Sequence, residues 1–234
     1  MTPEERQQAV RHLRRVDPVL GSFIRRFGPC TLNPQRGLSP FAALVRAVAH
    51  QQLHGRAAEA IFARFLALFP EVDFPAPAAI LATDEAMLRA AGFSAAKIAT
   101  IRAISAAAEA GTIPTRRAAA RLSDEALIER LTSVRGIGRW TVEMLLISNL
   151  GRPDVLPVDD FGIREGYRLL HGLAAQPKPR ALAELGAIWA PYRSVAAWYL
   201  WRHVAEVREK SRAVKAARPA APARQARSAK PARA

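Results

Sequence analysis

Cysteine is almost missing from this 234-residue sequence, which contains Cys30 alone. A single thiol excludes an internal disulfide framework and any zinc or iron–sulfur site that needs several cysteines. The five histidines are spread along the chain without the spacing of metal ligands. We therefore expect no metal site, no resident cofactor and a reducing compartment.

Long apolar runs are also missing, although 50% of the residues are hydrophobic. No run approaches the roughly 18 residues that a membrane-spanning helix needs. The first segment, residues 1–16, is polar and amphipathic and lacks the apolar centre of a signal peptide. These absences predict a cytoplasmic chain without a membrane segment.

Acidic residues are scarce beside basic ones. Lysine and arginine together number 35 against 20 aspartates and glutamates, which gives a formal net charge of +15. Such an excess favours a polyanionic partner, with nucleic acid ahead of an anionic membrane. It also predicts an association with the nucleoid.

The positive charge is concentrated near the end of the chain. Residues 210–234 contain no acid and these basic residues: Lys210, Arg212, Lys215, Arg218, Arg224, Arg227, Lys230 and Arg233. This stretch also has prolines and no aromatic residue, so it cannot bury enough apolar surface to offset its ordering entropy. We predict a compact body over residues 1–208 and a disordered basic tail over residues 209–234. The tail either serves solubility alone or holds DNA phosphates with a salt-sensitive affinity.

Strand signals are nearly absent, and apolar residues recur at helical spacing almost throughout. Spacing and capping residues predict helices over residues 3–16, 41–49, 56–69, 85–91, 95–110, 123–132, 139–150, 160–169, 180–190 and 194–208. Residues 28–39, with Gly, Pro and Asn, form a connector. We expect an all-α fold of two helical lobes with a groove between them, the first helix packing with the C-terminal lobe.

The most informative stretch is a predicted helix–hairpin–helix over residues 126–150. The chain turns at Gly136, Ile137 and Gly138, where two glycines permit positive φ and leave backbone N–H groups uncovered. These N–H groups open a helix whose N-terminus favours an anion, and Arg135 and Arg139 add positive charge. Apolar residues at core spacing flank the turn: Leu131, Val134, Ile137, Val142 and Leu145. The stretch predicts a hairpin that holds one DNA phosphate without reading sequence.

Two adjacent carboxylates, Asp159 and Asp160, lie about twenty residues beyond the hairpin and precede a predicted helix. Acids at such a position commonly serve only as helix caps. Trp140 and Phe161 flank the pair and can form an aromatic wall. Cleavage of an N-glycosidic bond builds positive charge on the sugar, and a fixed carboxylate beside C1′ stabilises that charge or activates a water. Capping and catalysis are both open for this pair.

Four ordered blocks together resemble the helix–hairpin–helix DNA glycosylase superfamily, most closely the DNA-3-methyladenine glycosylase II family. The blocks are FAALVRAVAHQQL at residues 41–53, GIGRWT at 136–141, LPVDDFGIR at 156–164, and PYRS at 191–194 leading to Trp201. The similarity covers roughly residues 40–208. It implies that the groove between the lobes binds DNA and contains the active-site cleft.

The resemblance assigns the catalytic carboxylate to Asp160 and leaves Asp159 as a helper or cap. It assigns the pocket for the damaged base to four residues: Trp140, Trp201, Phe161 and Met144. Met144 stands where some members have a pocket tyrosine, so it fills space but donates no hydrogen bond. Because the final predicted helix is apolar, Trp201 can alternatively be a core residue.

The resemblance also assigns DNA contacts to the loop that follows the helix at residues 41–49. Gln51 and Gln52 would face the DNA, and Leu53 would fill the gap left by the extruded base. From the sequence alone, Leu53 fits a core position equally well. His54 departs from the small hydroxyl residue that is common there. The family resemblance further allows a structural monovalent cation at the hairpin carbonyls.

In related bifunctional glycosylases, the position of Trp140 holds a lysine that forms a Schiff base. The resemblance therefore implies a monofunctional enzyme without lyase activity. We predict a monomer that flips an alkylated base of the 3-methyladenine class out of duplex DNA and hydrolyses its N-glycosidic bond, which initiates base excision repair. Two alternatives stay open: a non-enzymatic DNA-binding protein that keeps the hairpin, and a glycosylase for oxidised or mismatched bases.

Overall fold

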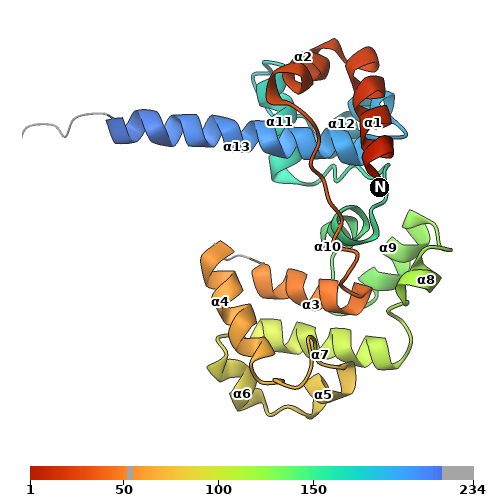
Figure 1. Cartoon of the computed structure of the whole chain (residues 1–234), viewed down its shortest axis with the longest axis vertical. Coiled ribbons are helices and arrows are strands. Elements are labelled where there is room, and N and C mark those ends of the chain that lie inside the picture. Colours follow the sequence, from red (N-terminus) through yellow and green to blue (C-terminus); the bar gives the residue numbers. More distant parts are fainter. Residues whose placement is uncertain (52–54, 218–234) are drawn as a thin grey trace, which may run out of the picture.

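The computed structural model describes residues 1–51 and 55–217, and within these ranges the chain is helical without a strand. The helices form two lobes with a connecting layer between them, which confirms the predicted all-α, two-lobed fold (Figure 1). One lobe contains α1 (Pro3–Val16), α2 (Pro18–Phe27), α11 (Phe161–Leu170), α12 (Pro179–Leu185) and α13 (Arg193–Ala217). The other contains α3 (Pro40–His50), α4 (Gly55–Leu66), α5 (Pro77–Ala82), α6 (Glu85–Ala90) and α7 (Ala95–Glu109). Between the lobes lie α8 (Arg116–Ala119), α9 (Asp124–Thr132) and α10 (Arg139–Leu145).

The first helix packs with the C-terminal lobe, as predicted, where α1 contacts α2, α13 and the 3₁₀ turn η2 (Gly186–Trp189). Leu13 of α1 is buried in that core. Asp17 caps α2 by accepting a 2.9 Å bond from the Leu20 amide, and Trp189 Nε1 donates a 3.0 Å bond to the same carboxylate. This buried contact ties the N-terminal helices to η2, which precedes α13.

Several helix starts follow the capping residues read from the sequence. The Asp84 carboxylate accepts from the Ala86 amide at 2.7 Å, and the Ser123 hydroxyl accepts from the Ala126 amide at 3.1 Å. Such bonds satisfy N–H groups that have no partner inside the helix. Helices α2, α5 and α8 were not predicted: α2 and α5 each begin at a proline, which looks like a helix breaker in the sequence, and α8 is only four residues long.

The last helix corrects the predicted boundary between body and tail. Helix α13 extends to Ala217, past the expected end at Arg208. Lys210 Nζ lies 2.6 Å from Glu206 Oε1 one turn earlier, and the alanines, lysines and arginines that follow have high helix propensity. Residues 218–234 of the predicted tail lie outside the described residues.

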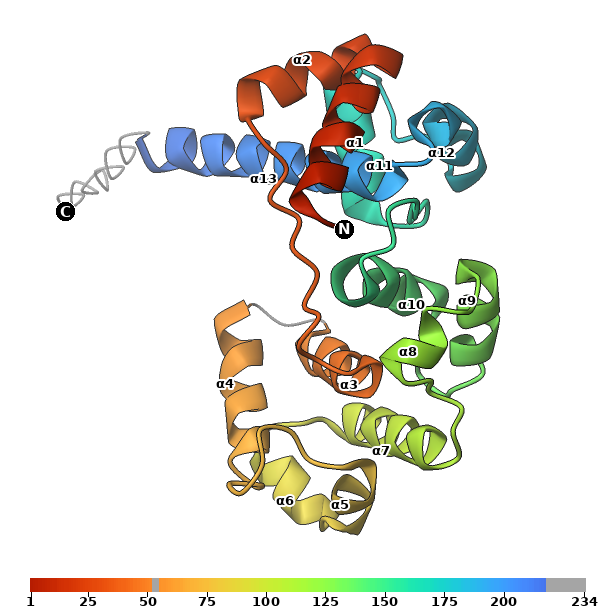
Figure 2. The same cartoon turned by 45° about the vertical axis from the view of Figure 1, so that its right-hand side comes forward.

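The connector over residues 28–39 crosses from one lobe to the other and is fixed by a buried amide (Figures 1 and 2). Asn149, in the π-helical turn η1 (Leu146–Leu150) that continues α10, is 3% exposed. Its Nδ2 donates 3.0 Å bonds to the carbonyls of Gln35 and Leu38. Arg116 of α8 donates to the Asn149 side chain and to the Leu38 carbonyl. One amide therefore holds together the connector, α8 and the helix that leaves the hairpin.

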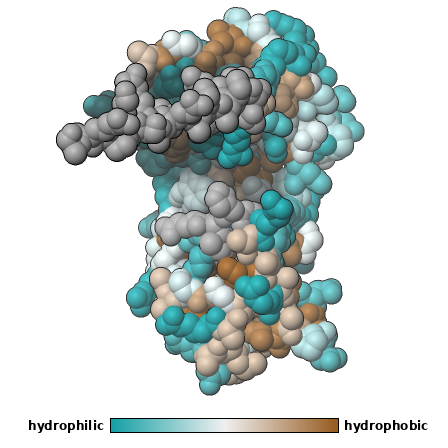
Figure 3. All heavy atoms as spheres, turned by 90° about the vertical axis from the view of Figure 1, so that its left-hand side faces the viewer, coloured by the Kyte–Doolittle hydropathy of each residue, from teal (hydrophilic) through white to brown (hydrophobic). Residues whose placement is uncertain are grey.

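Seen from the side on which α4 and the free end of α13 lie, the surface narrows between the lobes (Figure 3). Within the described part of the chain, no helix is long and apolar enough to cross a bilayer.

We expect Asn149→Ala to lower the free energy of unfolding by about 1–3 kcal/mol, because the carbonyls of the connector lose a buried donor. Urea unfolding followed by circular dichroism measures this change. Ser148→Ala, on the adjacent exposed side chain, is the matched control. Equal stability of the two variants would contradict the assigned role of the amide.

Candidate active site

The predicted hairpin is present between α9 and α10. Ile137 is 4% exposed and anchors the turn in the core, while Arg135 and Arg139 are exposed. The predicted apolar residues are all buried: Leu131, Val134, Ile137, Val142 and Leu145. The turn thus projects two arginines into solvent from a rigidly packed base.

The two glycine positions of the hairpin differ in whether the backbone there needs a glycine. Gly136 has φ +85°, and an added Cβ would overlap the side chain of Thr100 on α7. Gly138 has an ordinary φ of −92°, and a Cβ there would meet no atom within 4 Å. Only Gly136 therefore uses the left-handed freedom that the sequence suggested for both.

Gly138 is the N-cap of α10, and no side chain caps this helix. The amides of its first turn are consequently not covered by a capping side chain. Helix α10 continues into η1, so the backbone dipoles run in one direction from Arg139 to Leu150. This geometry suits an anion above the turn, beside the exposed guanidinium of Arg139.

Asp160 lies at the meeting point of α10, α11 and α13. It is the N-cap of α11, where its Oδ1 accepts a 2.8 Å bond from the Ile163 amide. Trp201 Nε1 of α13 donates to the same oxygen at 3.0 Å. Trp140 Nε1 of α10 donates to Oδ2 at 2.6 Å. Three donors from three helices thus fix the position and direction of one half-buried carboxylate.

Asp159 does not act as the helix cap, which corrects one of the two roles expected for it. Its side chain is exposed, and the capping bond is made by Asp160, three residues before Ile163. An N-cap side chain reaches the amide two or three residues ahead, so the second acid of the pair is the one in register. Asp160 therefore caps α11 and also accepts hydrogen bonds from Trp140 and Trp201.

Gly162 permits this convergence and was not singled out from the sequence. A Cβ at Gly162 would lie 3.0 Å from Asp160 Oδ1 and 3.0 Å from Trp201 Cδ1. Either neighbour would have to shift to admit it. A glycine two residues after the capping acid is therefore part of the site, although its sequence position alone resembles an ordinary helix start.

The predicted aromatic residues gather around the carboxylate. Trp140 is 44% exposed and Phe161 is 60% exposed, which is unusual for large aromatic side chains. Trp201 is half-buried and packs against the core on one side while its indole nitrogen reaches Asp160. Trp201 is thus both a partial core residue and a site residue, so the two readings of the sequence are compatible.

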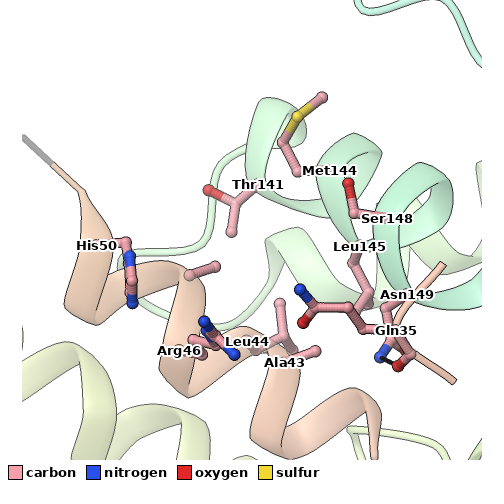
Figure 4. Close-up of a pocket in the computed structure, with 11 residues that line it drawn as sticks. Gln35, Ala43, Leu44, Arg46, His50, Thr141, Met144, Leu145, Ser148 and Asn149 are labelled. Atoms are coloured by element: carbon pink, nitrogen blue, oxygen red, sulfur yellow. Dashed lines mark hydrogen bonds between the residues drawn. The ribbon is translucent and has the colours of Figure 1, made fainter. Parts of the chain in front are cut away.

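Met144, the remaining predicted pocket residue, lines a cavity of about 190 Å³ between α3 and α10 (Figure 4). Thr141 and Leu145 contribute from the same side, and Arg46 and His50 contribute from α3. Met144 is the one predicted pocket residue that lines this cavity; the tryptophans and Asp160 do not. The cavity is therefore separate from the carboxylate, and Met144 is not grouped with the other predicted pocket residues.

Glu143 is a buried acid that the sequence analysis did not single out. It is 3% exposed, and Arg139 Nε donates a 3.0 Å bond to its Oε1. Burial raises the pKa of Glu143 above its usual value, the charge of Arg139 opposes this shift, and Asp159 and Asp160 add to it. The i,i+4 spacing of arginine and glutamate is a signal that was available in the sequence.

Lys97 of α7 fixes the chain where α3 ends. Its Nζ donates 2.8 Å bonds to the carbonyls of Ala49 and Gln51, at the negative end of the helix dipole. Burial lowers the pKa of Lys97. No short-range pattern indicates this contact, because the partners lie far apart in sequence. Gln51 is half-buried, whereas Gln52 and Leu53 lie outside the described residues.

Within residues 1–51 and 55–217, no three His, Cys, Asp or Glu side chains come together as a metal-binding group. Cys30 is buried, and burial raises its pKa to about 11. The monovalent cation at the hairpin carbonyls stays a prediction.

We expect Gly136→Ala to destabilise the protein by about 1–3 kcal/mol, because alanine is strained at this φ and overlaps Thr100. Gly138→Ala should change stability by less than about 1 kcal/mol, since its φ is ordinary and the space is open. It should nevertheless weaken DNA binding, because the methyl group covers the face of the turn. Thermal unfolding and fluorescence anisotropy on the same duplex measure both effects. Equal loss of stability in the two variants would contradict the assignment.

Comparisons with known proteins agree with this geometry. A family model described as HhH-GPD superfamily base excision DNA repair protein matches residues 45–191. Over 194 residues the chain is 47% identical to DNA-3-methyladenine glycosylase 1 of Schizosaccharomyces pombe, covering 82% of this chain and 84% of that protein.

Solved structures agree as well. A 3-methyladenine DNA glycosylase from the same yeast, in complex with abasic DNA, matches with a TM-score of 0.75 and 46% identity, covering 83% of this chain and 95% of that one. A DNA-3-methyladenine glycosidase from Bacillus halodurans matches with a TM-score of 0.77 and 33% identity, covering 86% and 91%.

Proposed function

The chain belongs to the HhH-GPD superfamily of base excision DNA repair proteins, and we propose that it is a monofunctional glycosylase for alkylated bases in duplex DNA. Its substrates would be bases of the 3-methyladenine class. The names of the yeast and Bacillus relatives support this substrate class. The abasic DNA bound to the yeast structure is the product that such a reaction leaves.

The observation that carries the proposal is the carboxylate of Asp160, held by two indole N–H groups and one backbone amide. As the N-glycosidic bond breaks, positive charge develops on the sugar. A carboxylate fixed beside C1′ stabilises this charge or removes a proton from the attacking water. A pure DNA-binding protein needs no such carboxylate, so the site favours the enzyme over the binder.

Selectivity follows from the charge of the lesion. An alkylated purine such as 3-methyladenine is cationic, so it leaves more readily than a normal base. Trp140 and Phe161 offer exposed aromatic surface beside the carboxylate, and Trp201 of α13 donates to the same carboxylate. A desolvated cation–π contact contributes about 1–2 kcal/mol, which neutral bases do not gain. Met144 adds apolar volume without a directional hydrogen bond.

The duplex would be held at two places. The uncovered amides at Gly138 and the exposed Arg135 and Arg139 suit a phosphate of the lesion strand. Leu53 would enter the duplex where the base has left, and Gln51 and Gln52 would face the DNA, with Lys97 fixing the start of that loop. Extrusion costs a few kcal/mol, and less at a weakened pair.

Trp140 supports the proposed absence of lyase chemistry. A Schiff base requires an amine beside C1′, and the residue that approaches Asp160 from the hairpin helix is an indole. Strand cleavage by β-elimination has no nucleophile at this position. The proposed product is an intact strand with an abasic site.

We expect Asp160→Asn to lower the rate of base release at least about a hundredfold while DNA binding persists, since the variant loses the negative charge but keeps the shape. Asp159→Asn, which removes the neighbouring exposed charge, is the control and should retain most activity. Release of methylated purines from alkylated duplex DNA under single-turnover conditions is the measurement. Near-normal activity of Asp160→Asn would remove the catalytic assignment.

Defined lesions test the substrate class. Alkylated DNA should release 3-methyladenine, and the strand should break only after alkaline treatment. Oligonucleotides with 8-oxoguanine, hypoxanthine or a mismatch should react much more slowly, because their bases are neutral leaving groups. Mass spectrometry identifies the released base, and denaturing gels show the strand. Preferred release of 8-oxoguanine, or breakage without alkali, would contradict the proposal.

A further inference from the structure

The C-terminal part of α13 leaves the body of the protein. Residues 195–200 of this helix are buried, whereas residues 208–213 are exposed without exception. Figures 1 and 2 show this end projecting past its lobe on the side where α4 lies in the other lobe. An isolated helical end gains no stability from core packing. Local helix propensity and the Glu206–Lys210 pair maintain this end, and its side chains are exposed to solvent.

The projecting part continues the face that carries the active-site tryptophan. Positions 4, 7 and 11 residues after Trp201 fall on the same side of a helix. They are Ala205, Arg208 and Arg212, and both arginines are exposed. The stripe is thus apolar and aromatic at the carboxylate and basic further out.

The neighbouring acids are largely engaged elsewhere. Glu206 accepts bonds of 2.6 and 2.8 Å from Arg26 and a 2.6 Å bond from Lys210, on another side of the helix. Glu165 of α11 is held by Arg168 and Gln176, whose hydrogen bonds lower its pKa, and the charge of Arg208 makes a smaller contribution in the same direction. Arg208 and Arg212 are themselves exposed, as is Glu209 between them.

We propose that Arg208 and Arg212 form a phosphate-binding arm that contacts the DNA backbone beside the extruded nucleotide. The inference rests on the proposed function, because Trp201 marks where that nucleotide would lie. Guanidinium groups bind phosphate oxygens in a bidentate manner, and the stripe is continuous with the site. At about 1.5 Å per residue, Arg212 lies about 17 Å from Trp201 along the axis, which matches about five base pairs of duplex.

The arm is tested by a double variant of the full-length chain, Arg208→Gln with Arg212→Gln. Fluorescence anisotropy gives the affinity for a 24-base-pair duplex with a central tetrahydrofuran abasic analogue, across a salt series. Each lost phosphate contact reduces the slope of log affinity against log salt by about 0.9, so we expect a reduction of about 1.8. Affinity at low salt should fall about tenfold or more, while single-turnover base release with saturating DNA should be unchanged.

The control removes the same charge from α1, with Arg11→Gln and Arg14→Gln, which are exposed and belong to a helix on the opposite side of the same lobe from the projecting end of α13. Its salt dependence should equal that of the unmodified protein. An unchanged slope in the α13 variant, or an equal change in both variants, overturns the proposal. Because binding is measured without base release, a failure of the proposed function appears separately, as inactive protein that still shows the α13-specific slope change.

Discussion

The convergence of three donors on Asp160 is the interaction on which the rest of the site depends. The donors come from α10, α11 and α13, which are separated along the chain by the loop after η1 and by the whole of α12. The three donors meet at Asp160 only when α10, α11 and α13 are all packed in their positions. The capping bond also sets where α11 begins, so a local backbone requirement and the position of the proposed catalytic carboxylate are satisfied by the same atoms. The carboxylate is therefore determined by the fold and does not depend on a flexible loop.

Polar contacts fix the chain segments around this point. Asn149 and Arg116 fix the connector that crosses between the lobes by donating to its backbone carbonyls. Lys97 of α7 fixes the C-terminal end of α3 within one lobe. A groove that must accept a duplex cannot be filled with apolar side chains, so polar cross-links at its edges supply rigidity in their place.

Local sequence signals predicted much of this arrangement. The hairpin, the capped starts at Asp84 and Ser123, and the candidate acid followed from short-range patterns. Two features required three-dimensional information. Whether Asp159 or Asp160 caps α11 depends on the exact residue at which the helix begins, which the sequence does not give to within one position. The role of Gly162 depends on the indole of Trp201, which belongs to a helix far away in the sequence. Contacts such as that of Lys97 pair atoms far apart in sequence, where no periodicity exists to detect.

Helix propensity and capping explain the other differences between the predicted and the observed helices. Helix α2 begins at a proline that looks like a breaker until Asp17 is seen to cap it, and the extension of α13 uses residues that also occur in disordered basic segments. Amino-acid composition distinguishes an exposed helix from a disordered segment poorly, because both are polar and solvent-exposed. The pocket residues were found by resemblance together with residue type, since an exposed tryptophan cannot be told from a buried one in the sequence.

The indole nitrogens of Trp140 and Trp201 occupy both oxygens of the acid before any nucleic acid is bound. The single donor on Oδ2 leaves acceptor capacity on that oxygen for an incoming water or nucleotide. Because the same two indoles supply both aromatic surface and hydrogen bonds, a substitution of either ring changes the surface offered to a base and the polarity around the acid together.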